Sequence, residues 1–176
     1  ADRARPGRDR SGAARMTAVA LAPDEHDLTV AVTAPRDPDA ATLIAEGDAA
    51  MLAIYPPEEI FSLTPAELAA PNVIFLVCRD KGRPAGCVAL VDEMEHGVIK
   101  RLYVREAARG RGVGTALMAE AEAQARDIGL TRLKLETGPA LAAAVGLYRR
   151  IGYVPCAAFG PYPDIPSNLF MEKRLA

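Results

Sequence analysis

Residues 102–115, Leu-Tyr-Val-Arg-Glu-Ala-Ala-Arg-Gly-Arg-Gly-Val-Gly-Thr, read as a strand that leads through a basic, glycine-rich loop into a helix. The first backbone N–H groups of a helix have no intrahelical partner and lie at the positive end of its dipole, so phosphate oxygens bind there. Glycines permit close approach and positive φ, and arginines add positive charge. The loop supplies both residue types, at Arg109, Gly110, Arg111, Gly112 and Gly114. The stretch therefore predicts a pyrophosphate-binding loop.

Two common nucleotide motifs do not fit this loop. A Walker loop requires Lys followed by Ser or Thr after its last glycine, which the residues after Gly112 do not provide. A dinucleotide fingerprint that starts at Gly110 requires Gly or Ala at position 115, where Thr115 stands. At this point a tight strand-to-helix turn with solvated arginines remains the alternative to a phosphate site.

The pattern of apolar residues around the loop predicts a mixed α/β order. Alternating or continuous apolar runs predict strands at 28–32, 73–78, 85–91, 97–104, 132–137 and 168–173, with a further strand starting at Tyr153. Helical spacing predicts a helix at about 40–54, with Asp39 as its cap, a second at 112–128, with Glu120, Glu122, Gln124 and Arg126 largely opposite the apolar stripe, and a third at 141–151. A capped turn is predicted at 64–67 and an irregular loop at 155–166. In the strand 97–104, period-two alternation places Arg101 on one face with Ile99 and Tyr103, and Leu102 on the other face.

Length, composition and charge limit the number of domains and the class of partner. The chain has 176 residues and 18.7 kDa, which is enough for one α/β domain, and no apolar run is long enough to span a bilayer. The net charge of −2 argues against nucleic acid as a partner. Residues 1–16 hold five Arg and two Asp, so we expect a disordered basic leader or a cloning remnant there, with a basic partner-binding arm as the alternative. Residues 17–176 are expected to form a single domain.

The cysteines and histidines give no sign of a metal or a disulfide framework. The three cysteines are Cys78, Cys87 and Cys156, there is no Cys-x-x-Cys pair, and the chain has two histidines. Cys78 and Cys87 lie within apolar runs, where a thiol usually behaves as a small buried hydrophobe. We therefore expect a reduced, cytoplasmic protein without a metal.

Three segments together resemble a known family. Arg109-x-x-Gly112-x-Gly114, with Lys100-Arg-Leu-Tyr-Val104 before it and Leu147-Tyr-Arg-Arg-Ile-Gly-Tyr153 after it, is similar to the GCN5-related N-acetyltransferases (GNAT). The resemblance covers about residues 28–175. The segments 135–138, 159–162 and 170–173 further resemble a bacterial subgroup of small-molecule acetyltransferases. The resemblance implies a mixed, splayed β-sheet of about six to seven strands flanked by about four helices, and acetyl-CoA as cosubstrate without a metal.

The same resemblance implies roles for residues. Tyr148 matches the family's general acid, and Glu136 is expected to act as base through water, because Val98 stands where some relatives carry Glu. The acceptor is expected to contact Arg101, Tyr55, Glu58, Tyr162 and Ser167. The cofactor is expected to contact Leu102, Tyr103, Val104, Arg109, Gly110, Arg111, Gly112, Val113, Gly114, Thr115 and Tyr148. Arg101 suits a substrate carboxylate, and its neutralisation by Glu136 or Glu172 is the alternative.

The expected function is acetyl transfer from acetyl-CoA to the amine of a small molecule that can bear a carboxylate, by direct attack in a ternary complex. A non-catalytic acyl-CoA-binding or regulatory module is the alternative. RNA binding through Arg109-Gly-Arg-Gly112 conflicts with the acidic balance of the remaining chain. The expected partner is a small-molecule amine, with neither nucleic acid nor membrane, and a homodimer is left open.

Overall fold

The computed structural model describes residues 27–176, so the expected leader and the first residues of the expected domain lie outside the described residues. The strands are β1 (Leu28–Val32), β2 (Val73–Asp80), β3 (Arg83–Asp92), β4 (Gly97–Val104), β5 (Arg132–Thr137), β6 (Val154–Pro155) and β7 (Leu169–Arg174). The helices are α1 (Pro38–Leu52), α2 (Pro65–Leu68), α3 (Val113–Asp127) and α4 (Ala142–Arg150), with short 3-10 turns at Pro57–Glu59 and Glu106–Ala108.

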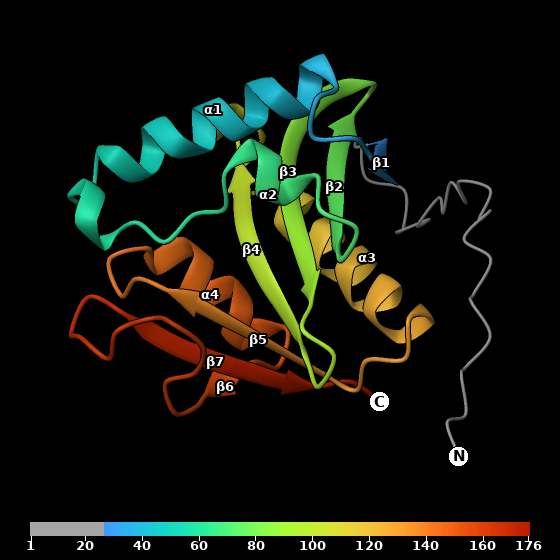
Figure 1. Ribbon diagram of the computed structural model, residues 1–176. Coiled ribbons are helices and arrows are strands. Elements are labelled where there is room, and N and C mark those ends of the chain that lie inside the picture. Colours follow the sequence, from blue (N-terminus) through green and yellow to red (C-terminus); the bar gives the residue numbers. More distant parts are fainter. Residues whose placement is uncertain (1–26) are drawn as a thin grey trace.

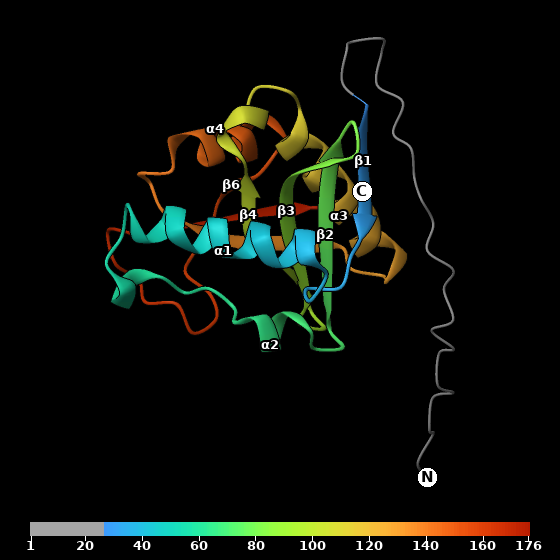
Figure 2. The same ribbon diagram turned by 90° about the horizontal axis from the view of Figure 1, so that it is seen from above.

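The strands form one open sheet in the order β1-β2-β3-β4-β5-β7-β6. All neighbours are antiparallel except β4 and β5, which are parallel. Helices α1 and α2 cover one face of the sheet, and α3 and α4 cover the other, as the two perpendicular views show (Figures 1 and 2). The expected mixed α/β sheet flanked by helices is confirmed.

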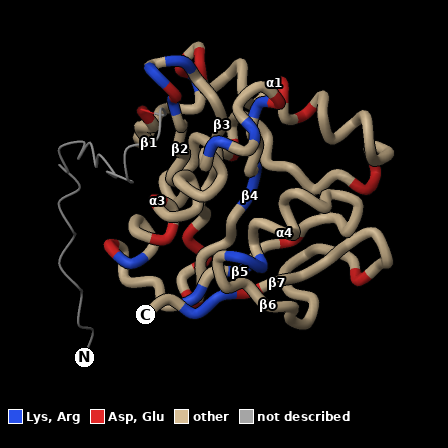
Figure 3. Tube along the Cα trace, turned by 180° about the vertical axis from the view of Figure 1, so that it is seen from behind, with Lys and Arg blue, Asp and Glu red and all other residues tan. Residues whose placement is uncertain are grey.

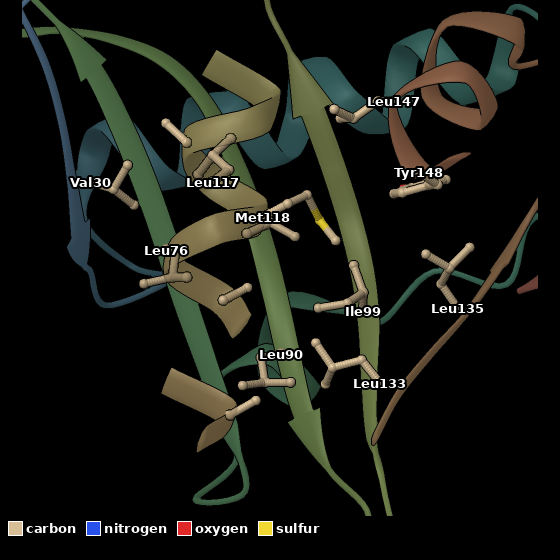
Figure 4. Close-up of a cluster of buried hydrophobic side chains, with 14 of the residues drawn as sticks. Val30, Leu76, Leu90, Ile99, Leu117, Met118, Leu133, Leu135, Leu147 and Tyr148 are labelled. Atoms are coloured by element: carbon tan, nitrogen blue, oxygen red, sulfur yellow. The ribbon is translucent and has the colours of Figure 1, made fainter. Parts of the chain in front are cut away.

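Each face of the sheet has its own apolar cluster. Under α3, Leu117 and Met118 pack against Leu76, Leu90 and Ile99 (Figure 4). Under α1, the fully buried side chains come from Ala40 and Leu43 of the helix and from the opposite sides of β2 and β3. Since alternate residues of a strand point to opposite faces, the continuous apolar runs of β2 and β3 serve both clusters.

The alternation predicted for β4 is wrong because this strand contains a bulge. Its register with β3 passes from Cys87–Tyr103 to Ala89–Lys100, so β4 holds one extra residue, and Arg101 has a φ of 56°. One extra residue reverses which face the rest of the strand presents. Ile99 and Leu102 therefore lie in the cluster under α3, whereas Tyr103 packs against the cluster under α1.

Two other local predictions differ from the structure. Asp37, rather than Asp39, caps α1, because Pro38 occupies the first helical position and the Asp37 carboxylate accepts the Asp39 N–H. Glu122 of α3, expected on the solvent face, is buried and accepts a hydrogen bond of 2.7 Å from Lys173. In residues 27–176, no helix has the length and apolar character needed to cross a membrane, and no group of three or more metal-binding side chains gathers.

Candidate active site

Strands β4 and β5 pair over only three residues of each strand and then diverge (Figure 1). The last parallel pair joins Ile99 to Leu135, whereas β4 continues to Val104. On its other side β4 stays paired with β3 up to Val104. The edge of residues 100–104 that faces β5 is therefore open. Unpaired strand edges of this kind readily pair with another extended chain.

A cavity of about 750 Å³ occupies the space between the diverging strands. The end that the sequence predicts for the cofactor, called the cofactor end below, is lined by Leu102, Tyr103 and Val104 of β4 together with the glycine-rich loop. The end that the sequence predicts for the acceptor, called the acceptor end below, is lined by Tyr55, Glu59, Phe61, Lys100, Glu136 and Ser167. The size lies within the usual range of small-molecule sites, about 300–1,000 Å³.

The glycine-rich loop has the backbone that the sequence predicts at two of its three glycines. Gly110 and Gly112 have φ values of 75° and 81°. Gly114 is helical, and a Cβ there would lie 2.9 Å from a methyl carbon of Leu147, so this glycine allows α3 to approach α4. Gly112 caps α3 without a side-chain hydrogen bond. The first N–H groups of α3 therefore lack a capping side chain at the cofactor end, which suits a phosphate ligand.

The two arginines of the loop lie in different places. Arg109 lines the cavity, and its Nε donates to the Val104 carbonyl oxygen at 3.3 Å. Arg111 does not line it, because its guanidinium pairs with the buried carboxylate of Asp80 at 2.9 Å. The expected cofactor residues that line the cavity are Leu102, Tyr103, Val104, Arg109, Gly110, Gly112, Val113, Gly114, Thr115 and Tyr148.

Tyr148 projects from α4 beside the point where β4 and β5 part (Figure 4). The side chain is buried, and its ring centroid lies 5.8 Å from that of Tyr153. Burial, with a smaller contribution from the charge of Glu136, raises the pKa of the Tyr148 phenol well above its usual value. The hydroxyl is therefore protonated at neutral pH and can donate a hydrogen bond.

Glu136 and Lys100 lie on neighbouring strands at the start of the divergence, and both line the cavity. Burial raises the pKa of Glu136, and the charge of Lys100 opposes that shift. Burial lowers the pKa of Lys100 to about 8, and Glu136 opposes that shift in turn. The cavity thus holds one half-buried acid, Glu136, and one buried base, Lys100, and the pKa values of both are shifted toward neutrality.

The expected acceptor residues are brought together only in part. Tyr55 and Ser167 line the cavity, and an added Cβ at Gly138 would overlap the Tyr55 hydroxyl, so Tyr55 closes over the end of β5. Glu58 is exposed and lies outside the cavity, whereas its neighbour Glu59 lines it. The two differ because the 3-10 turn directs successive residues to different sides. Tyr162 lies behind the wall, with its ring against Phe61.

Arg101 lines the cavity, but its guanidinium is occupied by protein groups. It pairs with Asp48 of α1 at 2.6 Å, and its Nε donates to the Leu63 carbonyl oxygen at 2.8 Å. Neither Glu136 nor Glu172, the two partners considered from the sequence, pairs with it among the described residues. Arg101 therefore ties α1 and the segment before α2 to the bulge of β4.

Sequence reasoning missed Arg105 and Gly47, which hold β4 against α1, and Lys100, which lies beside the bulge. Arg105 forms two hydrogen bonds of 2.8 Å with Glu46, and Gly47 lets α1 approach Tyr103. No sequence signal links α1 to β4, because these contacts span more than 50 positions. Lys100 could have been found, since a lysine inside a mostly apolar strand is unusual.

The comparisons with known proteins identify the family. The sequence profile of the acetyltransferase (GNAT) family matches residues 41–153, which cover the bulged strand, the glycine-rich loop and α4. The chain belongs to the GNAT acetyltransferase family. As a GNAT member it is an acetyltransferase enzyme, and the splayed β4–β5 pair expected from the sequence is present.

Individual relatives agree with this assignment. The IAA acetyltransferase of Azospirillum brasilense is 38% identical over 151 residues, which cover 85% of this chain and 99% of that protein. The blasticidin-S acetyltransferase of Streptomyces morookaense is 32% identical over 114 residues, covering 62% of this chain and 82% of the relative. A solved structure from Klebsiella pneumoniae, named as a candidate acyl-CoA N-acyltransferase, is 37% identical, covers 85% of this chain and 98% of its own, and superposes with a TM-score of 0.71.

Proposed function

We propose that this GNAT protein transfers the acetyl group of acetyl-CoA directly to the amine of a small molecule while both are bound. The observation that carries the proposal is the continuous cavity from the N-terminus of α3, along the open edge of β4, to Lys100 and Glu136. Two relatives named for IAA and blasticidin-S support a small-molecule acceptor. We retain a carboxylate on the acceptor as part of the proposal.

The residues of the cofactor end fit acetyl-CoA. The N–H groups at the start of α3, with Arg109, would hold the pyrophosphate, and the open edge of β4 at 102–104 would pair with the pantetheine amides. The same backbone edge lies beside Tyr148 and would polarise the thioester carbonyl. Acetyl-CoA supplies the activated acetyl group.

In the proposed reaction the amine nitrogen attacks the thioester carbon, the C–N bond forms and the C–S bond breaks. Glu136 accepts the proton that the amine loses, through a bridging water, and Tyr148 donates a proton to the departing sulfur. The products are the acetylated amine and CoA with a free thiol, and both side chains return to their starting protonation states through solvent. Much of the rate then comes from orientation of the two reactants.

The test is CoA thiol release by the full chain, measured with acetyl-CoA and a panel of primary amines. We expect release that depends on the presence of at least one class of amine. Binding of acetyl-CoA without amine-dependent release anywhere in the panel would contradict the proposal and favour the acyl-CoA-binding module.

A further inference from the structure

Lys100 is the first residue of β4 beyond its pairing with β5, and it lines the acceptor end of the cavity. The residue is only 7% exposed. Its Nζ donates to the Phe61 carbonyl oxygen at 2.8 Å and lies 4.2 Å from the centre of the Tyr162 ring. The ammonium group therefore has one backbone acceptor and one aromatic face as neighbours.

These neighbours do not satisfy a buried ammonium. Such a group has three N–H donors and a full charge, and burial of an unpaired charge is costly. Within residues 27–176, no carboxylate lies within ion-pair distance of its Nζ. Arg101, the next residue, is in contrast ion-paired with Asp48 and hydrogen-bonded to the Leu63 carbonyl oxygen. Of the two adjacent cations, Arg101 is closed to a ligand and Lys100 is open to one.

The charge opposite Lys100 adds a second condition on the ligand. Glu136 lines the same end of the cavity from β5 and interacts electrostatically with Lys100 without forming an ion pair. A ligand that carries both a carboxylate and an amine would complement the two side chains at once. A simple monoamine would leave the Lys100 charge unpaired.

We propose that Lys100 binds the carboxylate of an amino-acid-like acceptor and so directs its amine toward Glu136. This inference rests on the proposed acetyl transfer and specifies its substrate class. It assigns to Lys100 the role that the sequence suggested for Arg101. The basic pair is visible as a blue stretch midway along β4 in Figure 3.

A purely structural role for Lys100 makes a different prediction. Lys100 and Arg101 both hold carbonyl groups of the segment 61–63, so Lys100 could serve only as a tether of that segment. Loss of a tether would impair every acceptor to a similar degree. Loss of a carboxylate-binding group would impair only acceptors that carry a carboxylate.

The experiment measures kcat/KM for acetylation of a panel of α- and ω-amino acids and of their primary carboxamides, with rates referred to the concentration of unprotonated amine. We expect the parent protein to prefer the acid over the matched amide, and Lys100→Met to reduce that preference by about 10- to 100-fold, mainly through the KM of the acid. Lys100→Arg should retain part of the preference. Lys134→Met is the matched control, because Lys134 also lies over a ring, that of Phe159, but does not line the cavity.

Each outcome decides between the possibilities. Equal losses for acids and amides in folded Lys100→Met would overturn the inference and leave a tether. A parent protein that acetylates amides as well as acids would also overturn it, while the proposed function would stand. An absence of CoA release with every member of the panel would overturn the proposed function and, with it, this inference.

Discussion

The cofactor end of the cavity is built from residues that are neighbours in the sequence, whereas the acceptor end is assembled from distant segments. The loop from Arg109 to Thr115 follows directly on the open edge of β4. The acceptor end depends on hydrogen bonds from Lys100 and Arg101 to backbone 39 and 38 positions away, and on the Arg101–Asp48 pair, 53 positions apart. The cofactor end can therefore be recognised as a motif in the sequence, whereas the acceptor end depends on tertiary contacts between distant segments.

The largest effect is expected at the cofactor end, from Gly112→Val. Gly112 has a φ of 81°, and an L side chain with a branched Cβ is strained in that region by about 1–2 kcal/mol and would displace the first N–H groups of α3. The dissociation constant for acetyl-CoA, measured by calorimetry, should rise about 100-fold or more.

Gly129→Val is the matched control for this prediction. Gly129 has a φ of 85° at the other end of α3, with open space around its Cβ position. It should lower the melting temperature without weakening acetyl-CoA binding. Equal losses of affinity in both variants would mean that Gly112 acts through stability alone.

Tyr148→Phe tests the proposed role of the Tyr148 hydroxyl, which lies between the cofactor end and the acceptor end. The lost hydroxyl acts as charge develops on sulfur, so the turnover number should fall by about 100-fold, the lower range for general acid catalysis, with the acetyl-CoA dissociation constant nearly unchanged. The control is Tyr153→Phe, because the Tyr153 hydroxyl is buried without a hydrogen-bond partner in the described region and does not line the cavity. If the two variants turned over equally fast, Tyr148 would be a packing residue only.

The pH dependence of the preference for acids over amides tests whether the charge of Lys100 binds the carboxylate. The pKa of Lys100 is about 8, so the side chain is charged below that pH and loses its charge as the pH rises through it. The groups that face it are Glu136, Glu93 and Arg101, together with Tyr162, whose pKa is raised to about 12. The preference for acids over amides should therefore fall about 5- to 10-fold between about pH 7 and 9, because the charged fraction of Lys100 falls about tenfold over that range. Lys100→Arg should remove this fall, and a fall that persists in that variant would assign the titration to another group.

The smallest effect is expected for Arg111→Gln. Arg111 pairs with Asp80 outside the cavity, so the acetyl-CoA dissociation constant should change by less than about threefold, while the melting temperature falls because the Arg111–Asp80 ion pair is lost. Arg109→Gln, which alters an arginine that lines the cavity, should weaken binding more. If calorimetry showed that Arg111→Gln raises the acetyl-CoA dissociation constant as much as Arg109→Gln or more, Arg111 would be a pyrophosphate-binding residue.

The contrast between the two ends also explains what the sequence could predict. The positions of the strands along the chain, the helix after the loop and the positive φ of Gly110 and Gly112 follow from local patterns. The bulge at Arg101 could not be predicted, because it is defined by register with β3, and it changed which side chains face the acceptor. Glu58 and Glu59 differ by one step of a 3-10 turn, which no periodicity in the sequence resolves.

The central claim is that acetyl-CoA lies along the open edge of β4, and residue-resolved hydrogen exchange tests it most directly. Saturating acetyl-CoA should slow exchange at least about tenfold for edge-facing amides within 102–104 and for the first amides of α3, while β2, which is paired on both sides, is unaffected. Bound acetyl-CoA with unchanged exchange at 102–104 would contradict the account.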